Sequence, residues 1–315
     1  MLKIVSSTPP HDLARVFVGR LDDGELVEMV ESVQPPIPRE QKWVLIVSTL
    51  KGCPVKCAIC DAGGRYRGKL TAAEIVAQVD ALIATRFPPG DVVPVRRLKV
   101  QFARIGEPAL NEAVLDALEM LDHRPDLPGF FPSISTIAPS GRDGFFDRLL
   151  AIKRRRFGHG RLQLQFSIHT TDEQVRRRLV PVRTWSFARI AEYGARFVED
   201  GDRKVTLNFA PARGLPLDPE AVARTFSPRH FLIKLTPINP TRAAKEAGLI
   251  GMIEPCDEVA CNEVAEGFRR VGFDALISIG ELEENQIGSN CGMHLATVQA
   301  GRYLRSQESR SGRRD

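Results

Sequence analysis

Residues 43–60 read Trp-Val-Leu-Ile-Val-Ser-Thr-Leu-Lys-Gly-Cys-Pro-Val-Lys-Cys-Ala-Ile-Cys, and this stretch determines the fold and the chemistry that we expect. Residues 43–49 are a largely apolar run, typical of a β-strand buried on both faces. Directly after it, Cys53, Cys57 and Cys60 follow with the spacing C-x₃-C-x₂-C. Thiolates are the natural ligands of iron–sulfur clusters, so three of them on one tight loop predict a 4Fe–4S cluster with one iron open to a substrate or cofactor.

A zinc site and a chance grouping of buried cysteines are the alternatives for this loop. Structural zinc sites use four ligands, commonly as two C-x₂₋₄-C pairs, and no second pair lies nearby in the sequence. A tight group of cysteines is also more typical of metal binding than of a disulfide framework. The spacing therefore favours the iron–sulfur cluster.

Strands and helices alternate along the sequence after residue 43. Thr71 and Glu74 have the spacing of a capping box, which predicts the start of the first helix. Such alternation predicts a parallel sheet with right-handed crossovers and with functional residues at the carboxyl ends of its strands. The expected strands cover residues 43–49, 98–103, 131–136, 162–168, 205–210, 231–236 and 275–279. The expected helices lie near residues 75–83, 111–121, 145–152, 187–198, 219–226 and 258–271.

Roughly six strand–helix units fit into the chain, fewer than the eight of a closed barrel. We therefore expect an α/β fold, a partial (β/α)6 barrel with an N-terminal β-hairpin extension. Residues 14–21 and 25–32, around Asp22-Asp23-Gly24, are the expected strands of that hairpin. The predicted division is a hairpin extension over residues 1–40, a barrel with a C-terminal cysteine loop over 41–296, and a basic tail over 297–315.

The composition fits a chain with a sizeable core and a basic surface. Of the 315 residues, 43% are hydrophobic, and the formal net charge is +5 at pH 7. No apolar run approaches the roughly 18 residues of a membrane-spanning helix, and the N-terminus has no secretory signal, so we expect a cytoplasmic protein without a membrane partner. Basic runs at residues 153–156 and 176–178 suit a polyanionic partner, although solvated helix faces explain them equally well.

Gly106-Glu107-Pro108 follows the second expected barrel strand, where a carboxylate is placed to accept hydrogen bonds from an ammonium group. With the cysteine loop, this pattern resembles the radical S-adenosylmethionine (SAM) superfamily over residues 43–282, although Ile105 replaces the first glycine of its "GGEP" element. In that superfamily the open iron chelates SAM, and one electron cleaves SAM to methionine and a 5′-deoxyadenosyl radical. The resemblance implies a 4Fe–4S cluster, SAM and a one-electron reductant such as flavodoxin or ferredoxin.

Further motifs resemble the RlmN/Cfr family of RNA adenine methyltransferases, in the same order along most of the chain. The matching segments are residues 27–28, 52–57, 106–111, 135–136, 167–169, 178–181, 236–240 and 290–295. The residues that would contact SAM by this resemblance are Gly106, Glu107, Ser135, Ser167, Ile168, His169 and Asn239. Carboxylate, hydroxyl and amide groups suit the ammonium, carboxylate and ribose of that cofactor.

Cys291 lies in the last of these motifs, at the position of the family's methyl carrier. The resemblance implies that Cys291 accepts a methyl group from one SAM, that a second SAM yields the radical that takes hydrogen from it, and that the carbon radical adds to an sp² carbon of adenine. Glu28 falls at the position of a candidate base. The sequence departs at the family's resolving cysteine, where Ile46 stands, and Cys256 and Cys261 are either substitutes or ordinary buried thiols.

The leading interpretation is a radical SAM methyltransferase that places a SAM-derived methyl or one-carbon unit on an adenine-like or other heteroaromatic sp² carbon through a methylated cysteine. One alternative is another hydrogen-abstraction reaction on a small molecule or peptide. A second is a non-enzymatic iron–sulfur protein that binds nucleic acid. The family's helical RNA-binding domain has no counterpart before the hairpin, so RNA, a nucleotide, a small molecule and a peptide all stay open as substrates.

Overall fold

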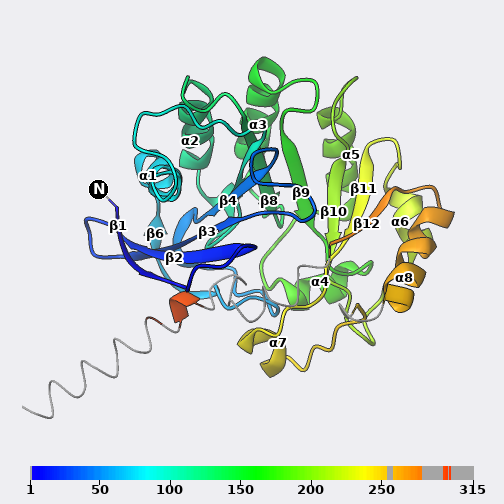
Figure 1. Ribbon diagram of the computed structural model, residues 1–315. Helices are drawn as coiled ribbons and strands as arrows, with labels where there is room; N and C mark the ends of the chain where they lie inside the picture. The colour runs from blue at the N-terminus through cyan, green and yellow to red at the C-terminus, as the bar shows by residue number, and fades with distance from the viewer. Residues whose placement is uncertain (1, 254–257, 279–293, 297, 299–315) are drawn as a thin grey trace, which may run out of the picture.

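The computed structural model describes residues 2–253, 258–278, 294–296 and 298. Over these residues, ten strands form one sheet in the order β1-β2-β3-β4-β7-β8-β9-β10-β11-β12, and all neighbours from β4 onward are parallel. The parallel strands are β4 (Trp43–Val47), β7 (Leu98–Phe102), β8 (Phe130–Thr136), β9 (Gln163–Ser167), β10 (Val205–Phe209), β11 (Phe231–Leu235) and β12 (Ala275–Ile277). Figure 1 shows them as a curved sheet with helices along its outer side. The predicted α/β fold with a mostly parallel sheet is confirmed.

The helices connect these strands much as the sequence predicted. The first one, α1, begins after Thr71, whose side chain accepts from the backbone N–H of Glu74 while Glu74 returns a bond to the Thr71 N–H. The helices that were expected are α1 (Ala72–Ile83), α2 (Ala113–Asp122), α3 (Asp143–Arg156), α5 (Phe187–Phe197), α6 (Pro219–Thr225) and α8 (Glu258–Arg270). Two short helices were not predicted, α4 (Glu173–Leu179) and α7 (Arg242–Glu246). No helix in the described part of the chain is long and apolar enough to cross a membrane.

The N-terminal hairpin is confirmed and continues the barrel sheet. Strands β2 (Ala14–Arg20) and β3 (Leu26–Ser32) pair antiparallel, and β3 pairs antiparallel with β4. Strand β1 (Lys3–Ser7), which was not predicted, adds to the outer edge of the hairpin. A separate two-stranded sheet, β5 (Leu50–Cys53) with β6 (Gly64–Lys69), was also missed and follows β4 directly. The predicted division at residues 1–40, 41–296 and 297–315 stays a prediction.

Side chains alternate between the two faces of the parallel sheet. In β7, Leu98, Val100 and Phe102 belong to the main hydrophobic core, and the residues between them, Lys99 and Gln101, point to the opposite, inner face. On β7, polar side chains therefore face the inside of the partial barrel, in contrast to the bulky aliphatic layers that fill a closed barrel.

Arg176 is the buried side chain that ties the carboxyl-terminal ends of two strands together. It is 2% exposed and lies on α4, which packs beneath those ends. Its guanidinium donates to the carbonyl oxygens of Ile137 at 2.8 Å, after β8, and of Ser167 at 3.0 Å, in β9. It also donates to the Trp185 carbonyl at 3.1 Å and the Thr184 hydroxyl at 3.0 Å. Burial lowers the pKa of Arg176 to about 10, so the group still stays charged at neutral pH.

We predict that Arg176→Met lowers the free energy of unfolding by roughly 3 kcal/mol, since it leaves buried acceptors without donors. The matched control is Arg177→Met, which removes the same charge from an exposed neighbour and should cost less than about 0.5 kcal/mol. Urea denaturation of both variants measures the difference. An equal loss of unfolding free energy in the two variants would show that the buried contacts of Arg176 do not stabilise the fold.

Candidate active site

The three clustered cysteines lie on the β5–β6 hairpin, at the carboxyl-terminal edge of the parallel sheet. Cys53 ends β5, and Cys57 and Cys60 follow in the connection to β6. Gly52 has a φ of +73°, and a Cβ there would lie 2.4 Å from the carbonyl oxygen of Arg65. Only glycine allows that close approach, so the sequence before Cys53 is fixed by the tight hairpin that presents the thiols.

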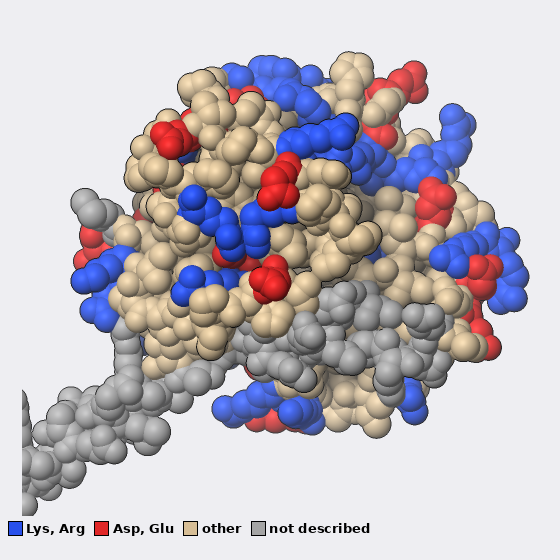
Figure 2. All heavy atoms as spheres, viewed as in Figure 1, with Lys and Arg blue, Asp and Glu red and all other residues tan. Residues whose placement is uncertain are grey.

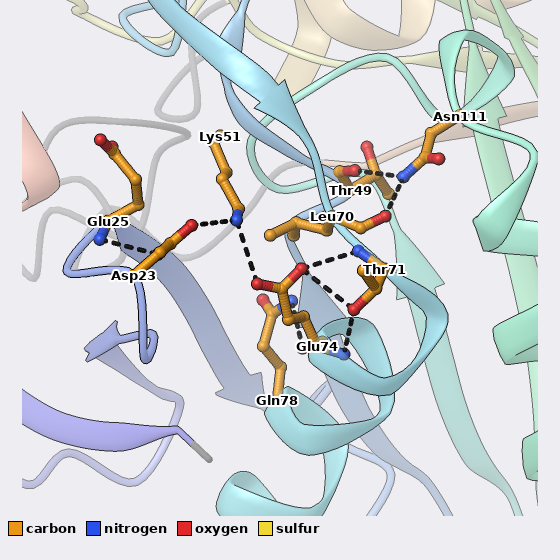
Figure 3. Close-up of polar contacts among 9 residues, drawn as sticks. All are labelled: Asp23, Glu25, Thr49, Lys51, Leu70, Thr71, Glu74, Gln78 and Asn111. Carbon is orange, nitrogen blue, oxygen red and sulfur yellow. Dashed lines mark hydrogen bonds and ion pairs between the residues drawn. The ribbon is translucent and has the colours of Figure 1, made fainter.

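Hydrogen bonds and ion pairs connect the base of the β5–β6 hairpin to neighbouring parts of the chain, as Figure 3 shows. The Asn111 amide donates to the carbonyl oxygen of Thr49 at 2.8 Å and to that of Leu70 at 2.7 Å, one on each side of the hairpin. Lys51, on β5, forms ion pairs with Glu74 of α1 at 3.0 Å and with Asp23 of the β2–β3 turn. The cysteine hairpin is therefore fastened to the barrel and to the N-terminal extension.

The three cysteines are partly buried, and the surroundings of Cys53 and Cys57 disfavour the ionised forms of these two thiols. Burial raises the pKa of Cys57 to about 12, with Cys53 and the Glu107 carboxylate adding to the effect. Burial also raises the pKa of Cys53. Thiolates at this position need a positive partner, and iron supplies one. No set of three His, Cys, Asp or Glu side chains within the described ranges is spaced for a single metal ion; a cluster with several irons spaces its ligands more widely.

Glu107 follows β7 and lies next to the cysteine hairpin, in a position that requires the preceding glycine. Gly106 has a φ of +104°, and a Cβ there would come within 2.6 Å of the Leu50 side chain. The Glu107 carboxylate, 5% exposed, accepts from the Ile137 N–H at 2.9 Å, from the Ala109 N–H at 3.0 Å and from the Thr136 hydroxyl. Burial raises its pKa to about 7 in spite of these hydrogen bonds, which act in the other direction.

His169 and Asn208 bring buried polar atoms without partners to the same edge of the sheet. The Nδ1 atom of His169 and the amide oxygen of Asn208 are both buried, and neither has a hydrogen-bond partner among the described residues. His169 has a φ of +68°, a strained value for a non-glycine residue. Burial lowers its pKa to about 4, so the ring is neutral. Buried polar atoms in native proteins are normally satisfied, so this geometry indicates a polar ligand.

The other residues expected to contact SAM surround this region. Ser135 lies near the end of β8, where its hydroxyl accepts from Gln101 at 3.4 Å. Ser167 ends β9, and the N–H groups of Ile168 and His169 donate to the Asn208 carbonyl at 2.8 and 3.2 Å. Asn239 is half-buried in the segment after β11. All of these positions follow or end parallel strands, as barrel chemistry requires.

Glu28 forms a separate, fully buried contact that reaches the C-terminal segment. Its carboxylate pairs with Arg104 at 2.6 Å, and the two side chains are 0% and 1% exposed. The other carboxylate oxygen accepts from the Leu295 N–H at 2.6 Å. Leu295 in turn packs with Val18 of the hairpin, Ala62 of the cysteine loop and Ile105. Glu28 thus joins the extension, the loop before Glu107 and residues 294–295.

The structure describes Ile46 and only one of the three remaining cysteines, Cys261. Ile46, on the inner face, packs against Ala14, Val16 and Val30. Cys261 lies on α8 and is buried in the main core, which supports its interpretation as an ordinary thiol. Cys256 and Cys291 lie outside the described residues.

Sequence reasoning missed Arg104, Thr136, Arg176 and Asn208 as parts of the site. Asn208 carries a usable signal, since it interrupts the otherwise apolar end of the strand Val-Thr-Leu-Asn-Phe. The arginines carry none, because their partners lie far away in the sequence.

Comparison with known proteins agrees with this geometry. The crystal structure of a radical SAM methyltransferase from Sphaerobacter thermophilus superposes with a TM-score of 0.70, at 25% identity, over 93% of this chain and 80% of that one. The chain is 30% identical over 291 residues to the probable dual-specificity RNA methyltransferase RlmN of Heliobacterium modesticaldum, covering 90% of this chain and 70% of the relative. It is 32% identical over 253 residues to a probable RNA methyltransferase of Thiobacillus denitrificans, covering 77% and 62%. No protein-family model matches.

The fold and the structural match thus identify the chain as a radical SAM methyltransferase. More specifically, the chain belongs to the RlmN family of radical SAM RNA methyltransferases. It spans between 62 and 78% of the length of the curated relatives that it matches.

We predict that the protein, reconstituted anaerobically with iron and sulfide, binds about four irons, as a cubane held by three thiolates does. Changing Cys53, Cys57 or Cys60 to Ala should abolish SAM cleavage, whereas Cys261→Ala, in the core, should leave the iron content unchanged. Iron and sulfide analysis with assay of 5′-deoxyadenosine measures both effects. A triple Ala variant that keeps a full complement of iron would disprove the assignment.

Proposed function

We propose that the protein methylates an sp² carbon of an adenine-type base in RNA, using a 4Fe–4S cluster, SAM and Cys291. The observation that carries the proposal is the meeting of the cysteine hairpin, the Glu107 carboxylate and the unpartnered atoms of His169 and Asn208 at one edge of the sheet. The printed descriptions of the relatives, which are RNA methyltransferases, support the substrate class.

The residues present fit both cofactors. In the proposal Cys53, Cys57 and Cys60 hold the cluster, and Gly106, Glu107, Ser135, Ser167, Ile168, His169 and Asn239 surround SAM. When bound, the pair supplies a carbon-centred radical that removes hydrogen from an unactivated C–H bond. The protein's own part is to bind, orient and keep water away, which a buried polar edge beside apolar walls such as Val55 and Ile137 does well.

Glu107 has one acceptor position to spare for the SAM ammonium group. A carboxylate offers about four lone-pair sites, and the Thr136 hydroxyl and two backbone N–H groups occupy three of them. These fixed donors hold the carboxylate in place before the cofactor arrives. Their number leaves a single charge-assisted contact for the ligand, which is enough to orient one amino group.

Glu28 serves as a positioning residue in this proposal. Its carboxylate is fully buried, faces Arg104 and holds the Leu295 N–H, so its contacts favour anchoring over proton transfer to a substrate. Cys291 precedes Leu295 by four residues in the sequence and lies outside the described residues. With Ile46 in place of a resolving cysteine, release of a covalent adduct must use another group. Cys256 and an external thiol are favoured over Glu28 acting as a base, because the Glu28 carboxylate is already paired.

A different hydrogen-abstraction reaction at the same cofactors is the second candidate. Ile46 favours it, because that residue removes the family's usual release route and packs in an apolar cluster instead. A flavodoxin or ferredoxin is the proposed electron donor for either reaction.

We predict that Glu107→Gln weakens SAM binding by one to two orders of magnitude. Loss of a hydrogen bond to a charged group costs roughly 1.5–3 kcal/mol, and each 1.4 kcal/mol corresponds to about tenfold in affinity. Equilibrium binding of SAM to the reconstituted protein measures the change. The exposed neighbour Glu112 provides the control Glu112→Gln, which should bind SAM normally; equal affinity in both variants would remove Glu107 from the cofactor site.

The test of the proposed function is the fate of the SAM methyl group. With methyl-deuterated SAM and an RNA fragment, we predict label first on Cys291, by peptide mass spectrometry, and then on an adenine carbon of the RNA. Cys291→Ala should abolish both while SAM cleavage continues. Label that never leaves SAM, or full product formation by Cys291→Ala, would favour the second candidate.

A further inference from the structure

The basic run at residues 153–156 turns out to be neutralised by neighbouring acids, whereas Arg176 of the run at 176–178 is buried and donates to uncharged oxygen atoms. On α3, Lys153 pairs with Asp202 and with Glu199 at 2.7 Å, and Arg155 pairs with Glu119. The neighbouring Arg154 and Arg156 also have carboxylate partners. Figure 2 shows the resulting pattern, with acidic side chains interspersed among the Lys and Arg side chains of the face in view. A polyanion therefore gains little from the run at residues 153–156.

Four other cations gather where the parallel strands begin. Lys42, Arg97 and Arg203 directly precede or stand near the starts of β4, β7 and β10, and Lys99 points into the barrel from β7. We call these four residues the basic mouth. Because the strands are parallel, the basic mouth lies at the end of the barrel opposite the cysteine hairpin.

The aromatic ring of Phe131 holds the basic mouth together. Phe131 pairs in register with Lys99 on the adjacent strand. The guanidinium carbons of Arg97 and Arg203 each lie 5.2 Å from the centre of its ring. Cation–π contacts of this kind order the two guanidinium groups and, apart from the Arg203 Nε–H that donates to the Gly160 carbonyl, leave N–H donors for a ligand.

The charges of the basic mouth have no carboxylate partner among the residues that the structure describes. None of the four side chains forms an ion pair within the part of the chain that the structure describes; Lys42 donates to Gln34, and Arg203 to the Gly160 carbonyl at 3.0 Å. Burial, followed by the neighbouring cations, lowers the pKa of Lys99 to about 7. Burial and then Arg97 and Arg203 lower the pKa of Lys42. The groups repel one another, so the arrangement costs stability unless an anion binds.

We propose that the basic mouth binds backbone phosphates of the RNA substrate, at a distance from the reacting base. Guanidinium forks and lysine ammonium groups around an aromatic ring match the chemistry of a phosphodiester chain. A five-residue strand is about 17 Å long, so an RNA of several nucleotides can reach from the reaction edge to the basic mouth. This inference rests on the proposed RNA substrate.

The experiment is the salt dependence of RNA binding, measured by titration of the reconstituted protein with a labelled RNA fragment. The test variant is the double substitution Lys99→Met with Arg203→Gln. It should weaken binding and reduce the slope of log affinity against log salt by about 2, since each lost phosphate contact reduces it by about 1. The control, Arg148→Gln with Arg155→Gln, removes the same net charge from residues that already have acidic partners and should leave the slope unchanged.

Thermal stability separates a binding role from a structural one. Lys99→Met removes a repelled, partly buried cation, so it should keep or raise the Tm while RNA affinity falls; a structural residue would lower both. If the test variant and the control both show the wild-type slope of log affinity against log salt, the inference is overturned and the proposed function is unaffected. A wild-type protein that binds no RNA would overturn both. A third outcome is that millimolar inorganic phosphate displaces RNA from the wild-type protein but not from the test variant. That outcome would overturn the inference and assign the basic mouth to free phosphate.

Discussion

Burial of thiols beside a buried carboxylate is the constraint on which the rest of the active site depends. Cys53, Cys57 and Glu107 lie close enough that the Glu107 charge raises the pKa of both thiols. Such a group cannot carry three negative charges in a protein interior without a positive partner. The tight hairpin after Gly52, the two hydrogen bonds of the Asn111 amide and the fixed donors around Glu107 all hold this unfavourable arrangement in place.

The two ends of the parallel strands consequently differ in chemistry. At the carboxyl ends, backbone N–H groups, buried carboxylates and unpartnered polar atoms form the site at which we propose that the iron–sulfur cluster and SAM bind. Two buried arginines hold the loops there: Arg104 pairs with Glu28, and Arg176 donates to the carbonyl oxygens of Ile137 and Ser167. At the opposite end the uncompensated cations lie around Phe131. A single sheet thus separates a site for chemistry from a surface suited to a polyanion.

The sequence was sufficient for elements whose signal is local. The Thr71 capping box, the turn at Asp22-Asp23-Gly24 and the apolar strands were all predictable, because neighbouring residues specify them. The β5–β6 hairpin was not, since Gly-Arg-Tyr-Arg-Gly-Lys has no apolar alternation and forms around the cysteine loop. Long-range partnerships escaped prediction for the same reason: the Arg176 and Glu28 side chains find partners that only the completed fold brings near. The basic run at residues 153–156 suggested a surface for a polyanion, but acids on other elements neutralise it, and nothing in the sequence indicates those contacts.

The central claim is that three thiolates leave one iron of a cubane free to bind SAM. Mössbauer spectroscopy of the anaerobically reconstituted, iron-labelled protein tests it most directly, with and without saturating SAM. The account predicts that the signal of about one iron in four changes when SAM is added, because only that iron lacks a cysteine. Spectra that are identical with and without SAM, or a site that fills with zinc in preference to iron, would contradict it.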